Sequence, residues 1–292
     1  MRDVSPTKRG DDAEGSYLSP AVQRAARLLR HIAEGDGATN MSRTARDLGI
    51  NRTTLLRLIR TLEAERFIET RPQGNGWQIG VGLIGLTAQA FFSEDLVQIS
   101  VPVLTQLAES LTLSAHLGVL DGRDVVYLVR RVPNHAFASN IRIGTRLPAY
   151  AANMGRIILA NLPPERVDRL YSGIVLKAVT AQTAVTLVQL HTQIEADRAA
   201  GLAWSEGNYE AGISSVAAPI FDVTDSPVAA LNVSGQTNDF VGAVRRNRIA
   251  GNVQAAAQEI SQRLGWRGPQ AADLLARNGR KAAASFASGT HG

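Results

Sequence analysis

The segment from Met41 to Trp77 constrains the fold of this 292-residue chain more than any other. Its pattern predicts a short helix over Ser42–Leu48 that ends at Gly49, followed by a longer helix over Asn51–Glu63. Two helices joined by a tight glycine turn predict a helix-turn-helix, whose second helix enters the major groove of DNA.

The longer helix has two faces of opposite character. At 3.6 residues per turn, its apolar residues share one stripe: Leu55, Leu58, Ile59 and Leu62. Thr53, Arg57 and Arg60 point the opposite way. Such a helix suits a major groove, where arginine reads guanine edges or contacts phosphate. An ordinary solvated helix surface has the same pattern, so the flanking elements decide between the two interpretations.

Those flanking elements favour DNA binding. Phe67–Arg71 and Trp77–Ile79 are strand candidates on either side of a Gly/Asn-rich turn, which predicts a β-hairpin in the position of a wing. Ahead of them, Ser19–Pro20 starts another helix, with Ser19 as the expected N-cap. Residues 19–79 are therefore predicted to form a winged helix-turn-helix DNA-binding domain.

Charge points to the same surface. Residues 19–79 contain 10 Arg and 6 Asp or Glu, a local charge of +4 out of +5 for the whole chain. Thr53, Thr54 and Arg57 are the expected base contacts, because the first residues of a recognition helix meet base edges. The expected phosphate contacts are Ser42, Arg43, Arg46, Arg52 and Arg60. From the wing, Arg71, Gln73 and Asn75 are expected to reach the DNA backbone or minor groove.

Composition excludes several other classes of protein. The chain has no Cys, which removes disulfides, thiol catalysis and Cys-ligated metals. No two of the five histidines stand at metal-ligand spacing, and no catalytic motif is present, so we expect no enzyme, metal or cofactor. His116, on a strand candidate, is expected to be a core or pocket-edge residue. No apolar run is long enough for a membrane span and Met1–Gly15 lacks a signal peptide's apolar region, so a cytoplasmic protein without membrane contact is expected.

A connecting segment follows the hairpin. Gly80–Gly85 matches the dinucleotide fingerprint G-x-G-x-x-G, but a wing strand precedes it and no parallel strand follows at the right distance. These glycines are expected to turn the chain out of the wing. Val81–Phe92 is apolar with a helical pattern, so residues 80–94 are expected to form a linker helix that packs on a partner subunit.

The rest of the chain predicts a second domain over residues 95–265. The expected helices are 96–111, 154–162, 164–171, 185–201 and 240–264. The expected strands are 114–120, 124–131, 141–144, 213–221 and 227–234. Strand pairs interleaved with helices indicate an α+β class with an antiparallel sheet. The polar ends of the chain, residues 1–18 and 266–292, are expected to be disordered tails.

At this point the residues resemble the IclR family of bacterial transcriptional regulators. The similar segments of the first domain are Val22–Ala25, Leu28–Leu29, Asn51–Ile59 and Trp77–Gly80. Those of the second domain are Ile143–Pro148, Met154–Ala160, Gly212–Ile220 and Val228–Gly235. The resemblance covers about residues 19–265.

This resemblance implies a GAF-like effector-binding domain after the winged helix-turn-helix. It also implies a homodimer or homotetramer that binds a double-stranded DNA operator and a small organic acid effector. The effector-binding residues it implies are Asn153, Met154, Ser205, Ser215, Asn232 and Ser234. Ser205 stands where the family is often acidic and Ser215 where many members carry Cys, which leaves the ligand open. Leu147–Arg156 looks most like the branch that regulates aromatic-acid and β-ketoadipate catabolism.

Simple chemistry is compatible with such a pocket. A carboxylate that leaves water needs fixed donors, and Asn232, Ser234, Ser215 and backbone N–H groups near Met154 can supply them. Arg142 or Arg146 is a candidate source of charge, although Arg146 is also read as one half of a structural salt bridge. Two other functions stay open: a small-molecule enzyme or sensor with secondary DNA binding, and a basic winged-helix module that contacts only proteins.

Overall fold

The computed structural model describes residues 18–268 except 73, 94 and 134–140, and these fall in two compact units divided between Ser93 and Glu94. Each unit is described by itself. None of the helices within the described ranges is long and apolar enough to cross a membrane.

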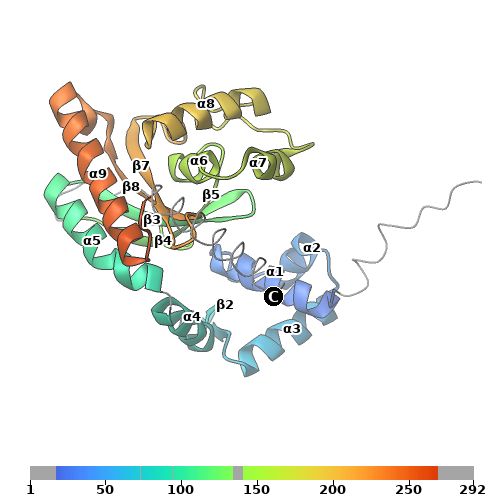
Figure 1. Cartoon of the computed structure of the whole chain (residues 1–292). Coiled ribbons are helices and arrows are strands. Elements are labelled where there is room, and N and C mark those ends of the chain that lie inside the picture. Colours follow the sequence, from blue (N-terminus) through green and yellow to red (C-terminus); the bar gives the residue numbers. More distant parts are fainter. Residues whose placement is uncertain (1–17, 73, 94, 134–140, 269–292) are drawn as a thin grey trace, which may run out of the picture. The chain divides into compact units, whose positions relative to one another are not determined.

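The N-terminal unit has three helices, a short hairpin and a fourth helix (Figure 1). Its elements are α1 (Pro20–Ala33), α2 (Met41–Asp47), α3 (Arg52–Ala64), β1 (Ile68–Thr70), β2 (Trp77–Ile79) and α4 (Val81–Ser93). The two strands pair antiparallel, with Ile68 opposite Ile79 and Thr70 opposite Trp77. The apolar stripe of α3 is buried through Leu55, Ile59 and Leu62, which pack with Leu28 of α1. This is the predicted winged helix-turn-helix.

Asparagine side chains set the beginnings of α2 and α3. The Oδ1 atom of Asn40 accepts from the N–H of Arg43 at 3.0 Å, and that of Asn51 accepts from the N–H of Thr54 at 2.7 Å. Each satisfies a backbone donor that the first turn of a helix leaves unpaired. Ser19 lies at the N-cap position of α1 as expected, but its side chain makes no capping hydrogen bond.

Gly80 and Gly82 direct the chain from the wing into α4. Their N–H groups donate to the carbonyls of Phe67 and Arg66, both at 2.9 Å. A Cβ atom on Gly80 would lie 2.5 Å from the Arg66 carbonyl oxygen, so only glycine allows this approach. Their role is close packing of the backbone against the end of α3.

The C-terminal unit is built on one antiparallel sheet of six strands in the order β5-β4-β3-β8-β7-β6. The strands are β3 (Ser114–Asp121), β4 (Asp124–Arg131), β5 (Arg146–Pro148), β6 (Ala203–Glu206), β7 (Ile213–Phe221) and β8 (Pro227–Gln236). The helices are α5 (Asp95–Leu111), α6 (Asn153–Ala160), α7 (Pro164–Tyr171), α8 (Leu187–Ala200), the 3₁₀ helix η2 (Thr237–Phe240) and α9 (Ala243–Arg263). The unit is an α+β fold, as predicted.

Helices cover both faces of this sheet (Figure 1). α6 packs on β3, β7 and β8, with α7 and α8 outside it, and the core between them contains Ile157, Val167 and Leu190. α5 and α9 pack together on the opposite face. Side chains along β7 point alternately to the two faces of the sheet. Ser215 and Ala217 face α6, while their neighbours face α9.

The structure differs from the sequence interpretation in three segments. Residues 141–144 form a turn that leads into β5, and that strand begins only at Arg146. Sequence analysis missed β6, whose four residues give too short an alternation to be recognised. The chain also continues to pack beyond Gly265, because Trp266 stacks on Phe221 with ring centroids 5.2 Å apart and donates from Nε1 to Asp225.

Candidate nucleic-acid interface and ligand pocket

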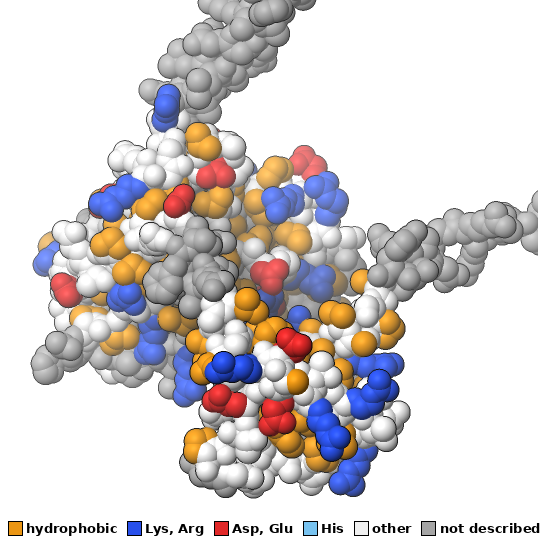
Figure 2. Space-filling view, turned by 90° about the horizontal axis from the view of Figure 1, so that it is seen from below, with side chains coloured by type: hydrophobic (Ala, Val, Ile, Leu, Met, Phe, Trp, Pro, Cys, Tyr) orange, Lys and Arg blue, Asp and Glu red, His pale blue; other side chains and the backbone are white. Residues whose placement is uncertain are grey.

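The outer face of α3 is exposed along its length. Arg52, Thr53, Arg57 and Arg60 are solvent-exposed, whereas Thr54 is half-buried beside its Asn51 cap. Among the described residues, none forms an ion pair with Arg52, Arg57 or Arg60. The space-filling view shows Lys and Arg side chains, in blue, on the surface of the protein (Figure 2). The face therefore offers hydroxyl and guanidinium donors without an internal competitor.

Helix α2 and the wing flank this face. Ser42, Arg43 and Arg46 of α2 are exposed, and Arg43 lies 3.6 Å from Asp47 in a surface pair that solvent screens. Asn75 is exposed at the tip of the hairpin, while Gln73 lies outside the described residues.

Arg71 has a structural contact that the sequence did not reveal. Its Nη2 donates to the carbonyl of Gly35 at 3.0 Å, and its guanidinium fills the space beside Gly37, which has a φ of +65°. The carbonyl of Gly37 in turn accepts from the N–H of Trp77 at 2.7 Å. Arg71 thus fastens the wing to the loop after α1, a function separate from the expected DNA contact.

A pocket of the C-terminal unit lies between the first turn of α6, the sheet and the loop after β6. Five of the six expected effector residues line it: Asn153, Ser205, Ser215, Asn232 and Ser234. The lining residues that sequence analysis did not expect in the pocket are Tyr127, Ile141, Leu147, Ala152, Tyr209, Glu210 and Ile213. The space open to the centre of a water molecule is about 40 Å³, which is room for a few waters.

Met154 is not among the lining residues. Its side chain is fully buried and lies against β3 at Gly118, where a Cβ atom would come 3.0 Å from the Met154 Cε. Met154 is adjacent to the pocket-lining Asn153 in sequence, but its side chain packs into the core.

Serines form a row across the sheet at the pocket. Ser205 pairs with Ser215, Ser215 with Ser234 and Ser234 with Ser114, so four adjacent strands each contribute one hydroxyl. All four are buried. The Ser234 Oγ makes no hydrogen bond within the described part of the chain. A buried hydroxyl without a partner costs free energy, and a ligand oxygen at this position can satisfy it.

A buried chain of amides lies next to this row. The Nδ1 of His116 lies 2.9 Å from the Oδ1 of Asn232, and the Nδ2 of Asn232 donates to the Oδ1 of Asn153 at 3.2 Å. The Nδ2 of Asn153 donates to the Oγ of Ser215 at 3.0 Å and to the carbonyl of Ala203 at 3.2 Å. Sequence analysis expected Asn153 and Asn232 in the pocket but not that they bond to each other.

Burial sets the charge states of the neighbouring rings. Burial, with a smaller contribution from Arg130, lowers the pKa of His116 to about 4 against the opposing hydrogen bond from Asn232. Burial also raises the pKa of Tyr127, whose ring meets His116 edge to face at 5.5 Å. Both groups are neutral at physiological pH.

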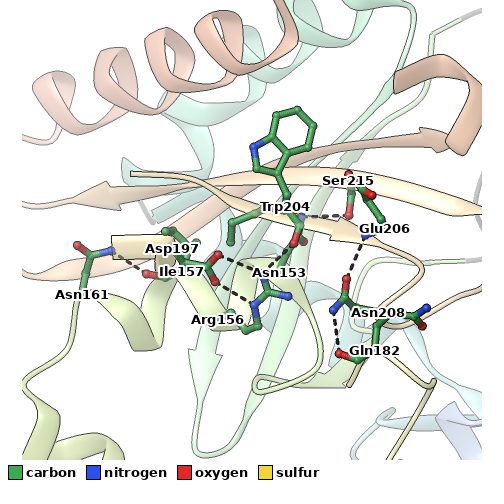
Figure 3. Close-up of polar contacts among 11 residues, drawn as sticks. Asn153, Arg156, Ile157, Asn161, Gln182, Asp197, Trp204, Glu206, Asn208 and Ser215 are labelled. Atoms are coloured by element: carbon green, nitrogen blue, oxygen red, sulfur yellow. Dashed lines mark hydrogen bonds and ion pairs between the residues drawn. The ribbon is translucent and has the colours of Figure 1, made fainter. Parts of the chain in front are cut away.

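An ion pair holds α6, the helix whose first turn lines the pocket, in place. Arg156 donates from Nε and Nη2 to the two carboxylate oxygens of Asp197, at 2.9 and 3.1 Å, and from Nη2 to the carbonyl of Trp204 at 2.8 Å (Figure 3). These contacts join α6 to α8 and β6. They fix the helix turn that carries Asn153.

Asn208 ties the loop over the pocket to a second loop. It accepts from the N–H of Glu206 at 3.0 Å and donates to the carbonyl of Gln182 at 3.2 Å (Figure 3). The neighbouring Tyr209 and Glu210 line the pocket.

The candidate arginines do not line the pocket. Arg146 bonds Asp121 at 2.6 Å and Asp124 at 3.3 Å, so the salt-bridge interpretation was the right one. Arg142 is likewise absent from the lining residues that the structure describes.

Comparison with known proteins supports the division into these two sites. Residues 21–72 match the model of the IclR helix-turn-helix domain, and residues 88–262 match that of the bacterial transcriptional regulator IclR C-terminal domain. The regulator RhmR of Escherichia coli K12 is 29% identical over 250 residues, which cover 86% of this chain and 95% of RhmR. The transcriptional repressor IclR of the same bacterium is 27% identical over 89% of this chain and 97% of its own length.

Solved structures show the same fold. A crystal structure of an IclR transcriptional regulator from Alicyclobacillus acidocaldarius has a TM-score of 0.73 and 27% identity, covering 85% of this chain and 99% of that one. An IclR homologue from Microbacterium hydrocarbonoxydans, crystallised with 4-hydroxybenzoate, has a TM-score of 0.73 and 22% identity, covering 84% and 98%. The matched families and named relatives are transcriptional regulators and not enzymes.

Proposed function

Because the chain belongs to the IclR family of DNA-binding transcriptional regulators, we propose that its operator affinity changes when a small organic acid binds in the C-terminal pocket. The observation that carries this proposal is the pairing of an exposed arginine face on α3 with a buried, partly unsatisfied polar pocket.

The exposed face of α3 is proposed to read the operator. Thr53, Thr54 and Arg57 lie in its first two turns, the part of a recognition helix that meets base edges. The proposed phosphate contacts are Ser42, Arg43, Arg46, Arg52 and Arg60, with Arg71 and Asn75 on the wing. We propose a homodimer or homotetramer, so that two copies of α3 enter successive major grooves about 34 Å apart on a near-palindromic operator.

The buried polar groups of the pocket fit a carboxylate, whereas the acid among its described lining residues, Glu210, is exposed. α6 begins at Asn153 without a side-chain cap, so the N–H groups of its first turn are available at the pocket end of the helix. The unpartnered Ser234 hydroxyl lines the same pocket. A carboxylate accepts from both kinds of donor, and it needs no arginine to do so.

The apolar lining favours an acid with a ring. Tyr127, Leu147 and Ile213 line the pocket beside its polar groups, as does Tyr209 of the loop. Aromatic and aliphatic side chains around a few fixed donors are usual for small-molecule sites. We therefore propose an aromatic acid as the first candidate, and 4-hydroxybenzoate, which a homologue of this fold binds, as the first probe.

The size of the pocket suggests how binding changes the protein. An aromatic acid is larger than the few waters that fit the present space, so we propose that the loop after β6 moves when the acid binds. A ligand shifts an equilibrium only by its unequal affinity for two states, typically by about 1–3 kcal/mol. The Asn208 contacts and the Glu206–Arg246 pair at 2.5 Å are the contacts that such a movement would change.

Selection of duplexes from a random library by the full chain tests the DNA-binding part. Arg57→Ala is expected to weaken binding of the selected duplex by about 1–3 kcal/mol, roughly 5- to 150-fold, if Arg57 pairs with a guanine. Arg169→Ala is the matched control, because Arg169 is exposed on α7 and its loss changes the net charge equally. Equal binding by the two variants would remove Arg57 from the interface.

A further inference from the structure

The hydrogen bonds around Asn153 can run in only one direction. A backbone carbonyl only accepts, so the group of Asn153 that faces Ala203 must be its NH₂. The same NH₂ faces the Ser215 Oγ, and the two bonds use both of its hydrogens. The carbonyl oxygen of Asn153 therefore faces Asn232.

That orientation determines the rest of the chain. Asn232 must present its NH₂ to Asn153 and its Oδ1 to His116. Since Oδ1 only accepts, the Nδ1 of His116 must carry the hydrogen, which makes neutral His116 the Nδ1–H tautomer. Its Nε2 is then a lone pair, and this atom is buried with no partner among the described residues.

We propose that His116 is a positioning residue of the pocket, because its Nδ1–H fixes the one-way chain and thereby leaves the hydroxyl hydrogen of Ser215 for an oxygen acceptor of the ligand. Ser215 accepts from Asn153 and so keeps its own hydrogen for the ligand. Ser234 lies on the paired strand and also has its hydrogen free, because its Oγ has no partner in the described residues. The inference rests on the proposed ligand pocket and names the buried residue that orients its polar groups.

His116 acts at a distance from the ligand. It is fully buried, is absent from the described pocket lining and touches Asn232, which does line the pocket. Without a donor at this position, Asn232 can rotate its amide and release Asn153. Asparagine at position 116 offers an N–H near the place of Nδ1, whereas leucine offers none.

The tautomer can be measured without any ligand. In the full chain with ¹⁵N-labelled histidine at pH 7.5, the His116 signals are identified by their loss in His116→Asn. The expected spectrum shows a protonated Nδ1 and an unprotonated Nε2. A protonated Nε2 would mean that the amide chain runs the other way, and the proposal would be overturned.

Ligand selectivity is tested with matched pairs of probes on one skeleton. Calorimetry compares 4-hydroxybenzoate with 4-hydroxybenzylamine, and cyclohexanecarboxylate with cyclohexylmethylamine. These titrations use a Glu210→Gln background, because Glu210 is an exposed acid that lines the pocket and would attract the amines. For each carbon skeleton that binds, the acid is expected to bind at least about ten-fold more tightly than the amine, which corresponds to the free energy of one good hydrogen bond. An amine that binds as tightly as its acid contradicts the proposal.

Variants at position 116 separate positioning from simple destabilisation. His116→Leu is expected to lower the ratio of acid affinity to amine affinity about ten-fold, while His116→Asn keeps this ratio within about three-fold of that of the unchanged chain. A purely structural role would weaken both probes alike and leave the ratio unchanged. If no acid binds, the proposed acid effector fails, and the tautomer measurement still decides the direction of the chain.

Discussion

Removing one partner of the Arg156–Asp197 pair is expected to destabilise the C-terminal unit strongly. Arg156 is 4% exposed and Asp197 8%, so neither charge has much water to replace a lost partner. The change Arg156→Leu deletes both bonds to Asp197 and the third bond to the Trp204 carbonyl. It leaves a carboxylate and a carbonyl without their donor.

The free energy of unfolding is expected to fall by about 3–5 kcal/mol, the usual cost of removing one partner of a buried ion pair. Asp197→Leu should cost a similar amount, because it leaves the guanidinium unpaired. The double variant should lose much less stability than the two single variants lose together, since it leaves no buried charge without a partner. Total stabilities of about 5–15 kcal/mol make each single loss a large fraction of the whole.

Urea unfolding followed by tryptophan fluorescence measures these losses. The chain has three tryptophans, and Trp77→Phe leaves Trp204 and Trp266 as reporters of the C-terminal unit. All variants are compared in that background. If each single variant loses less than about 1 kcal/mol of unfolding free energy, which is the range of a surface ion pair, then the pair is not shielded from water and this reasoning is wrong.

Three further predictions concern separate parts of the chain. Asn51→Ala removes the cap of α3 and should lower the free energy of unfolding of the N-terminal unit by about 1 kcal/mol, measured by urea unfolding through Trp77. Gly155→Ala would place a Cβ 2.3 Å from the Ala149 Cα, so it should cost about 1–3 kcal/mol or more in thermal unfolding, and a normal melting temperature would refute that packing. His116 has its pKa lowered from 6.5 to about 4, so the unfolded chain binds the extra proton between these values. Stability should fall by about 3 kcal/mol as the pH drops from 7 to 4, and a His116→Asn variant with the same pH profile would exclude this histidine as the cause.

The DNA-binding unit could be predicted from sequence because its signals are local. The stripe of Leu55, Ile59 and Leu62 and the turn at Gly49 lie within a few residues of one another. Helix periodicity and glycine turns act at that range. The contact of Arg71 with Gly35 was missed because its partner lies 36 residues away and is a backbone carbonyl, which has no sequence signature.

The pocket was predicted in part, and through resemblance more than through physics. Asn153, Ser215, Asn232 and Ser234 come from three separate elements, and no periodicity brings them together. Tyr127 and Tyr209 were missed because they resemble ordinary core and loop residues until the fold brings β4 and the loop after β6 to the same pocket. Met154 was expected beside Asn153 in the pocket, but adjacent residues of a helix point about 100° apart, and of these two only Asn153 is among the described lining residues.

The coupling between the two sites is the most direct test of the account. Fluorescence anisotropy of the selected duplex, with the full chain and increasing 4-hydroxybenzoate, gives the factor by which the acid changes DNA affinity. Calorimetry with and without the duplex gives the factor by which DNA changes acid affinity. The account predicts equal factors of about 5 to 150, since coupling between sites is reciprocal. An acid that binds in the pocket and leaves the DNA affinity unchanged would contradict it.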